Sequence, residues 1–225
     1  NALWGDRISV LVGDFLVSKA FSILVETGNV QVMRVISEAT TSLAEGETMQ
    51  TVRGGDLSLT EKEYLEIISN KTASLISAAC QTGAIMGRAA PGAEVSMREY
   101  GLNLGIAFQM VDDTLDYVSD NMKFGKALLK DLQEGKITLP LIHTMERASE
   151  QERGEIGSAL QQVPPGAEQA RRVVQLIQKY NGVEYVFSRA REYVRLSISN
   201  LNGLESPAVK EALTAAANYV VEREW

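Results

Sequence analysis

Five charged residues in the middle of the chain have the types and spacing of a site that binds a metal ion and a phosphate. Asp112, Asp113 and Asp116 occupy positions i, i+1 and i+4 of an apolar run with helical character, and Lys126 and Lys136 follow in a polar segment. Residues four apart lie one turn above each other on a helix, so Asp112 and Asp116 share a face, and Asp113 lies at its edge. Mg²⁺ prefers oxygen ligands and typically takes one or two carboxylates, several waters and substrate phosphates. The pattern predicts a Mg²⁺–diphosphate site in which the lysines bind the remaining phosphate oxygens.

The aspartates alone leave two interpretations open, because the same spacing also occurs on the solvated edge of an ordinary helix. The residues around them favour a binding site. Phe108-Gln109 stand just before the aspartates, and Gly125-Lys126, Asp131-Leu132 and the run from Glu134 to Pro140 follow. This arrangement resembles the second aspartate-rich motif and the trailing lysine segment of the trans-prenyltransferases, or polyprenyl diphosphate synthases, of the octaprenyl or decaprenyl type.

The resemblance implies a fold, an activity and a cofactor. Members of this family are all-α proteins of the isoprenoid synthase type, which are large helical bundles, usually homodimers, with a central active-site cavity. They use Mg²⁺ to condense isopentenyl diphosphate with an allylic polyprenyl diphosphate, which lengthens the chain by one isoprene unit. The resemblance makes Asp112, Asp113 and Asp116 the metal ligands. It also assigns Lys126 and Lys136 to the allylic diphosphate, with Lys136 closing or orienting a lid.

Lys71, Thr72 and Gln109 are further site candidates. By themselves, Lys71 and Thr72 are typical of an exposed lysine beside a hydroxyl that bonds back to its own helix, and Gln109 could instead bond to a neighbouring helix. The resemblance places Lys71 on the allylic diphosphate and Thr72 facing the developing cation. Gln109 lies one turn before Asp112 and Asp113, so its carbonyl can point into the same cavity. We therefore predict that these three residues are catalytic and bind the allylic substrate.

Two other segments match the family pattern. Gly46-Glu47-x-x-Gln50 and Gly13-Asp14-Phe15-Leu16 resemble family segments that we expect to support and orient the site. Two single residues add no chemistry in our interpretation. Cys80 lies among small residues, His143 follows a largely apolar run, and both are predicted to serve packing.

The composition fits one helical enzyme domain that spans residues 1–225. Hydrophobic residues make up 45% and aromatic residues 6% of the chain, which is rich in the helix-favouring Ala, Leu and Glu. The net charge of −7 argues against nucleic acid as a partner. The single cysteine excludes an internal disulfide and suits the reducing cytoplasm.

Caps and helix breakers divide the chain into predicted helices without a strand. These helices cover residues 6–27, 30–45, 60–88 and 94–118, and others begin at 140 and 150, after 166, at 183 and at 207. Gly28 is the expected end of the first helix. Thr60 to Glu63 form a capping box, and Pro207 follows a serine N-cap. The polar stretch from 119 to 135 is too long for a simple connection and predicts a lid or binding loop.

The first predicted helix contains the most apolar stretch of the chain. Ile8 to Val25 is long enough to resemble a membrane span, but Asp14 and Lys19 interrupt it, and both are costly in lipid. We expect a buried amphipathic helix and no transmembrane segment. Contact with a membrane is expected only at its surface, through an apolar product.

The front of the chain departs from the family pattern. The first aspartate-rich motif, the arginine pair after it and the basic residues for isopentenyl diphosphate are absent from the 225 residues. Asn1 to Asp6 resembles the segment that follows them, so we expect that an N-terminal part is missing. Two alternatives stay open. A non-catalytic partner or regulatory subunit of a heteromeric synthase is disfavoured by the intact Asp112 and Lys71, and a terpenoid cyclase or other prenyltransferase should lack the pattern from Gly125 to Pro140.

Overall fold

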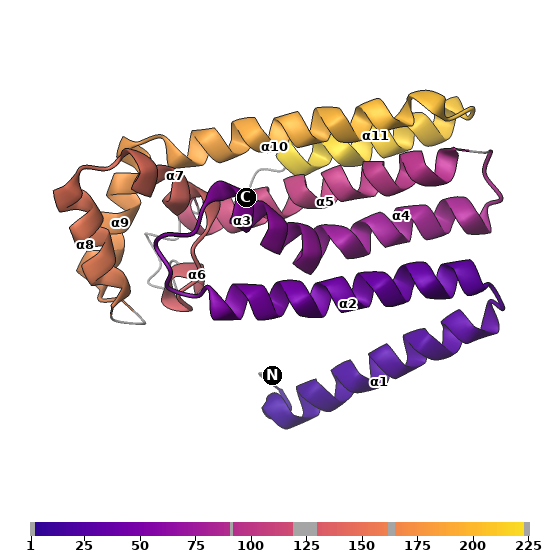
Figure 1. Cartoon of the computed structure of the whole chain (residues 1–225), viewed down its shortest axis with the longest axis horizontal. Coiled ribbons are helices and arrows are strands. Elements are labelled where there is room, and N and C mark those ends of the chain that lie inside the picture. Colours follow the sequence, from indigo (N-terminus) through magenta and orange to yellow (C-terminus); the bar gives the residue numbers. More distant parts are fainter. Residues whose placement is uncertain (1–2, 91, 119–129, 162–164, 223–225) are drawn as a thin grey trace.

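The computed structural model describes residues 3–90, 92–118, 130–161 and 165–222, and these form a bundle of helices without a strand (Figure 1). The all-α prediction is confirmed. The α-helices are α1 (Gly5–Glu26), α2 (Val30–Val52), α3 (Glu61–Ile68), α4 (Ser74–Met86), α5 (Ala93–Val118), α6 (Lys130–Gln133), α7 (Leu139–Arg147), α8 (Glu150–Leu160), α9 (Ala167–Lys179), α10 (Gly182–Ser199) and α11 (Pro207–Glu222). A π-helical turn, η1 (Ser69–Ala73), joins α3 to α4, and a 3₁₀ turn, η3 (Asn200–Gly203), follows α10.

Local chemistry sets most helix boundaries. The Thr60 hydroxyl accepts from the Glu63 amide at 3.3 Å, and the Glu63 carboxylate accepts from the Thr60 amide at 2.9 Å, so the predicted capping box opens α3. Gly28 has a φ of +62°, which an L side chain rarely adopts, and it ends α1 where predicted. The Asn29 side chain then caps α2 by accepting from two amides of its first turn.

Helix α5 is the centre of the bundle. It packs along α4 on one side and α10 on another, and α2 and η1 lie next to α4 (Figure 1). Tyr100, Ala107 and Met110 of α5 are almost completely buried, as are Leu139 and Leu141 of α7. Burial of a Leu or Met side chain contributes about 1.5–3 kcal/mol through removal of apolar surface from water. The core therefore fixes the second half of α5, where the three aspartates lie.

The predicted helix over residues 60–88 is wrong in one respect, because it is not continuous. It divides into α3, η1 and α4, and the π-helical turn covers Ser69 to Ala73. A π-turn widens one turn of a helix, and such turns occur frequently at functional sites. Hydrophobic periodicity could not show it, since the apolar pattern continues on both sides of the turn. Its consequence is that Lys71 and Thr72 stand on a local bulge.

Helix α2 is longer than predicted, because Gly46 lies inside it and does not end it. A Cβ atom on Gly46 would lie 2.4 Å from the backbone nitrogen of Lys71, and one on Gly105 of α5 would lie 2.5 Å from the Cα atom of Ala73. Real Cβ atoms essentially never come this close to backbone atoms. The two glycines therefore allow α2 and α5 to contact η1 from two sides.

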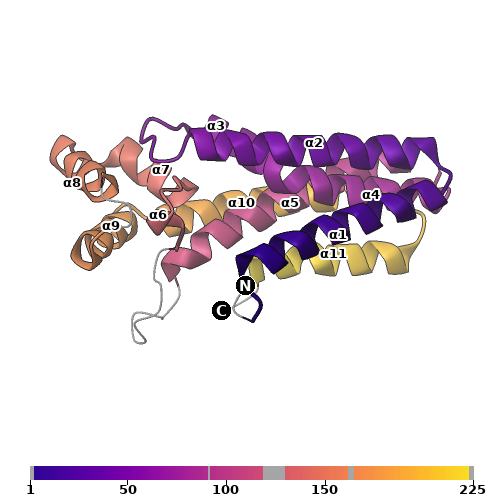
Figure 2. The ribbon, with the colours of Figure 1, turned by 90° about the horizontal axis from the view of Figure 1, so that it is seen from below.

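The expectation of a buried first helix is wrong. No residue of α1 is buried, and its apolar side chains, such as Phe15 and Leu16, are exposed. The two views show α1 on the outside of the bundle beside α2 (Figures 1 and 2). Its apolar residues are spread around the helix, so one neighbour cannot cover them. By length and composition, α1 is also the one candidate membrane span among the described helices, a test that core helices and signal sequences pass as well. The absence of a transmembrane segment stays a prediction.

We predict that Gly46→Ala destabilises the fold by about 1–3 kcal/mol, because the added methyl group must push η1 away from α2. Gly83→Ala in α4 is the matched control, since a Cβ atom on Gly83 would meet nothing within 4 Å. Alanine there should be neutral or stabilising by up to about 1 kcal/mol. Chemical denaturation of both variants measures the difference. Equal stability of the two variants would contradict the close approach.

Candidate active site

Helices far apart in the sequence bring the predicted site residues together at one end of the bundle. The turn η1 supplies Lys71 and Thr72, and the last turns of α5 supply Gln109 and the aspartates. The segment after α6 supplies Lys136, close to the end of α5. Lys126 lies outside the described residues, so its role stays a prediction.

Lys71 is held by two residues of α2. Its Nζ donates to Gln50 Oε1 at 2.6 Å and forms an ion pair with Glu47 Oε1 at 3.2 Å. These contacts agree with the interpretation that the Gly46-Glu47-x-x-Gln50 segment orients the site. They place a mostly shielded ammonium group on the same π-turn as Thr72. Gly13 and Asp14 lie on the exposed α1, and a supporting role for them stays a prediction.

A chain of hydrogen bonds connects Thr72 to the aspartates. The Thr72 hydroxyl donates to Gln109 Oε1 at 2.7 Å, and Gln109 Nε2 donates to Asp113 Oδ1 at 2.8 Å. The Tyr64 hydroxyl of α3 donates to the other oxygen of Asp113 at 2.6 Å. Gln109 Nε2 also lies 3.5 Å from Asp112 Oδ2. The chain joins three elements, α3, η1 and α5, through side chains alone.

Burial controls the electrostatics of this chain. Removal from water raises the pKa of Asp113 to about 7, even though the hydrogen bonds from Tyr64 and Gln109 favour the ionised carboxylate. Burial also raises the pKa of the Tyr64 phenol well above its usual value, and the negative charge of Asp113 adds to this effect. Tyr64 therefore keeps its proton at neutral pH and acts as a hydrogen-bond donor.

The three aspartates have three different environments. Asp112 is exposed, Asp113 is only 5% exposed, and Asp116 is half-buried. Asp116 Oδ2 accepts from the backbone amide of Asp131 at 2.9 Å, which ties the start of α6 to α5. Partial burial is the main reason why the pKa of Asp116 is raised. Helical geometry predicted Asp113 at the edge of the face that Asp112 and Asp116 share, whereas in the structure its side chain is buried in the protein interior.

Lys136 is anchored beside the aspartates. Its Nζ lies 2.8 Å from Asp131 Oδ1 and 2.8 Å from Glu134 Oε2. Partial burial disfavours its charge, but the hydrogen bonds and charges of the two carboxylates outweigh that effect and raise the pKa of the lysine. The Gly55 amide donates to the Gly135 carbonyl at 2.8 Å, so the loop before α3 holds the same segment.

The donor set at the end of α5 fits Mg²⁺ in part. Within the described ranges, no group of three or more His, Cys, Asp or Glu side chains forms a ready-made metal site. Asp112 and Asp116 are carboxylates on one helix face, and each has acceptor capacity left, because a carboxylate offers about four lone-pair sites. Two carboxylates are enough for Mg²⁺, which takes its other ligands from water and phosphate. Asp113 fits less well, because the protein engages both of its oxygens.

Tyr64 is the site residue that the sequence interpretation missed. It stands seven residues before Lys71, a spacing that puts two residues near one face of a regular helix. Many other residues of the chain share this spacing, so the sequence pattern does not distinguish Tyr64 as a site residue. Its partner on α5 is 49 positions away.

The two residues assigned to packing have packing roles. His143 is buried, and its ring stacks on Tyr185 with 3.9 Å between centroids. Burial is the main reason why its pKa is lowered. Cys80 is half-buried, and burial raises the pKa of its thiol. Neither residue contacts the hydrogen-bond chain described above.

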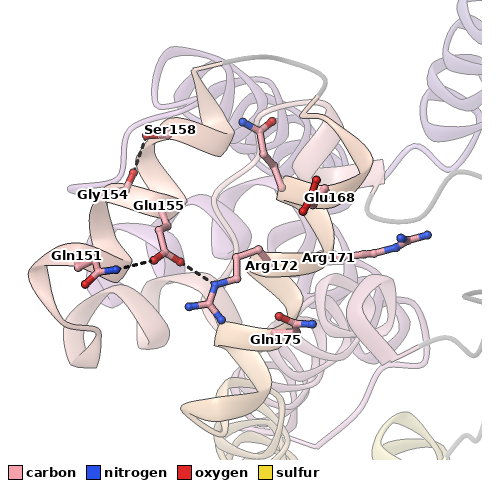
Figure 3. Close-up of a pocket in the computed structure, with 9 residues that line it drawn as sticks. Gln151, Gly154, Glu155, Ser158, Glu168, Arg171, Arg172 and Gln175 are labelled. Carbon is pink, nitrogen blue, oxygen red and sulfur yellow. Dashed lines mark hydrogen bonds and ion pairs between the residues drawn. The ribbon is translucent and has the colours of Figure 1, made fainter.

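Two grooves of the surface lie apart from this site. One, of about 720 Å³, runs between α8 and α9, where Glu155 and Arg172 form an ion pair at 2.7 Å (Figure 3). The other, of about 740 Å³, is lined by small and apolar residues of α4, α5 and the start of α11. None of the predicted site residues lines either groove, and the central cavity stays a prediction.

Comparison with known proteins places the chain in a family. The model of the polyprenyl synthetase family matches residues 1–177. The chain is a member of this family. It is 36% identical to the short chain isoprenyl diphosphate synthase of Methanothermobacter thermautotrophicus, covering 100% of this chain and 70% of that protein. It is 37% identical to the octaprenyl diphosphate synthase of Escherichia coli, with 100% and 69% coverage.

The fold agrees with solved structures of the family. The polyprenyl synthase of Caulobacter crescentus superimposes with a TM-score of 0.92 at 35% identity, covering 100% of this chain and 68% of that one. The resemblance inferred from the aspartate and lysine motifs is thus confirmed, as is the bundle of the isoprenoid synthase type. The chain is a trans-prenyltransferase of the chain-elongating class, and nothing in the comparisons favours the non-catalytic alternative.

Proposed function

We propose that this prenyltransferase is Mg²⁺-dependent and condenses isopentenyl diphosphate with an allylic polyprenyl diphosphate at the end of α5. One observation carries the proposal. The Thr72 hydroxyl, next to Lys71, donates a 2.7 Å hydrogen bond to Gln109, which precedes the aspartates on α5. Thr72 and Gln109 are 37 positions apart in the sequence. This contact supports a single site in which Lys71 would bind the diphosphate and the carboxylates would bind the metal.

The charges of the site suit a leaving diphosphate. Asp112 and Asp116 would hold Mg²⁺, which when bound supplies positive charge to the leaving group. Lys71 is preorganised by Glu47 and Gln50, so it can bind a diphosphate oxygen without a search through side-chain rotamers. Lys136 and Lys126 would add positive charge from the segment that follows α5.

Polar groups without nucleophilic character suit the developing allylic cation. Gln109 presents a carbonyl oxygen and Thr72 a hydroxyl oxygen, and both carry partial negative charge. Such dipoles stabilise a cation at a fixed position, and neither group is a strong nucleophile that would capture it. When the C–O bond of the allylic diphosphate breaks and pyrophosphate leaves, the double bond of isopentenyl diphosphate can attack the cation to form the new C–C bond. The released pyrophosphate can then take up the proton that is lost.

The named relatives support the substrate class. The Caulobacter crescentus polyprenyl synthase was solved with calcium and isoprenyl diphosphate, a divalent cation together with a prenyl diphosphate. Calcium and Mg²⁺ share a preference for oxygen ligands, although Mg²⁺ demands a tighter octahedral geometry.

The net charge of −7 supports a protein without a nucleic-acid partner, and the single cysteine supports the cytoplasm as its location.

We predict that Asp112→Ala abolishes Mg²⁺-dependent turnover and leaves the helix content unchanged, because Asp112 is exposed. The measurement is transfer of the prenyl group from an allylic diphosphate to radiolabelled isopentenyl diphosphate across a Mg²⁺ titration, with circular dichroism for the fold. Glu99→Ala on the same helix is the control, since that carboxylate pairs with Arg98 away from the site. Wild-type activity in Asp112→Ala would remove the metal assignment.

We predict that Lys71→Met weakens binding of the allylic diphosphate by roughly 10- to 100-fold, the equivalent of about 1.5–3 kcal/mol for a hydrogen bond to a charged group. The dissociation constant can be measured by calorimetry with a non-reactive allylic diphosphate analogue. Lys62→Met on α3 removes an equal charge from an exposed position and should bind the analogue normally. Equal affinity of the two variants would exclude Lys71 as a diphosphate ligand.

We also propose a homodimer. The support comes from α1, whose apolar side chains are exposed along its whole length, including Val10, Phe15 and Val25. Large exposed apolar surfaces mark interaction sites on folded proteins. Size-exclusion chromatography with light scattering should give twice the mass of one chain, and Leu16→Glu should lower that mass. A monomer at micromolar concentration would reject the dimer.

A further inference from the structure

Both carboxylate oxygens of Asp113 accept hydrogen bonds inside the protein. One oxygen accepts from Tyr64 and the other from Gln109, and the side chain is 5% exposed. Its neighbour Asp112 is exposed, and among the described residues it has one marginal contact, of 3.5 Å to Gln109. Adjacent aspartates of one motif therefore have different surroundings, and these indicate different tasks.

A carboxylate can decide which way an amide points. The two ends of a glutamine amide are nearly equal in shape, and only the hydrogen-bond partners distinguish them. An ionised carboxylate accepts hydrogen bonds and donates none. Gln109 Nε2 donates to Asp113 Oδ1 at 2.8 Å and Gln109 Oε1 accepts from the Thr72 hydroxyl at 2.7 Å, so these two partners hold the amide with its carbonyl oxygen toward Thr72.

Tyr64 in turn holds Asp113. Tyr64 lies on α3 and is 2% exposed, and its hydroxyl lies 2.6 Å from Asp113 Oδ2. Without this bond, the carboxylate could rotate or admit water, and the Gln109 amide would lose its fixed partner. The hydrogen bond links the orientation of one glutamine on α5 to the packing of α3.

We propose that Tyr64 is a positioning residue for prenyl transfer, which acts through Asp113 to fix the carbonyl of Gln109 toward the reacting carbon. Asp113 is then the anchor of Gln109, and the metal is left to Asp112 and Asp116. This inference rests on the proposed function, because the carbonyl has a task only if a cation develops in front of it. It adds a residue that the aspartate and lysine motifs do not contain.

The first test is Tyr64→Phe, which removes one oxygen atom. We expect kcat to fall roughly 10- to 100-fold, since a misplaced group costs about that much. The KM for both substrates and the half-saturating Mg²⁺ concentration should stay unchanged. A rise in the half-saturating Mg²⁺ concentration would overturn the inference, because it would make Asp113 a metal ligand.

Tyr100→Phe is the matched control. Tyr100 is also almost fully buried, and its hydroxyl donates to the Leu213 carbonyl at 2.8 Å, away from the site. Both variants lose one buried hydrogen bond and should lose thermal stability. Only Tyr64→Phe should lose kcat. If both keep the wild-type kcat, Tyr64 is structural and the inference fails.

A double-mutant cycle tests the route through Gln109. In a Gln109→Ala background, Tyr64→Phe should have no further effect on kcat, because the group that it positions is gone. Additive losses in kcat would show that Tyr64 acts by another route, which overturns the inference.

A measurement without turnover separates this inference from the proposed function. The side-chain amide of Gln109 gives a pair of ¹H–¹⁵N resonances, which a Gln109→Glu variant assigns. In Tyr64→Phe the pair should shift and exchange faster with water, and in Tyr100→Phe it should not. Unmoved resonances in Tyr64→Phe would overturn the positioning role. If the Gln109 resonances shift in Tyr64→Phe but the wild-type protein transfers no prenyl group, the proposed function is refuted and the positioning of Gln109 by Tyr64 is not.

Discussion

The site depends on the close packing of one π-helical turn between two helices. Gly46 of α2 and Gly105 of α5 let the backbone of η1 approach to distances that any side chain would block. A regular α-helix in place of η1 would turn Lys71 and Thr72 by a different angle relative to α5. Because Thr72 contacts Gln109 at 2.7 Å, the position of η1 determines the geometry of the hydrogen-bond chain from Thr72 through Gln109 to Asp113.

Most polar groups at this end of the bundle have hydrogen-bond or ion-pair partners within the protein. These contacts offset the free-energy cost of removing the groups from water. Unpaired polar groups are costly to remove from water. Lys71 has Glu47 and Gln50, Lys136 has Asp131 and Glu134, and the amide of Gln109 has partners at both ends. Among the described residues, the exposed Asp112 has only a 3.5 Å contact to Gln109. The pairing thus fixes the positions of Lys71, Lys136 and Gln109 through contacts within the protein.

Local signals were reliable wherever a few adjacent residues decide the structure. The Thr60–Glu63 capping box opens α3, and Gly28 ends α1, because caps and positive φ angles are satisfied within a few residues. The same kind of reasoning failed at Gly46. A glycine looks like a helix end from its propensity alone, but here it lies mid-helix because another segment passes close to it. It also failed for α1, since amphipathic character cannot reveal whether a second helix covers an apolar surface.

The sequence by itself determined the helical class, the family and the chemical type of the site, because motif residues and their spacing along one helix are local properties. Tertiary structure decided the surroundings of each carboxylate. Asp112, Asp113 and Asp116 are the same residue type within five positions, and only the packing of α3 against α5 brings Tyr64 to Asp113. It likewise decided that Glu47 and Gln50 hold Lys71. These assignments depend on contacts between residues tens of positions apart, and no pattern along the chain records the distance between two helices in space.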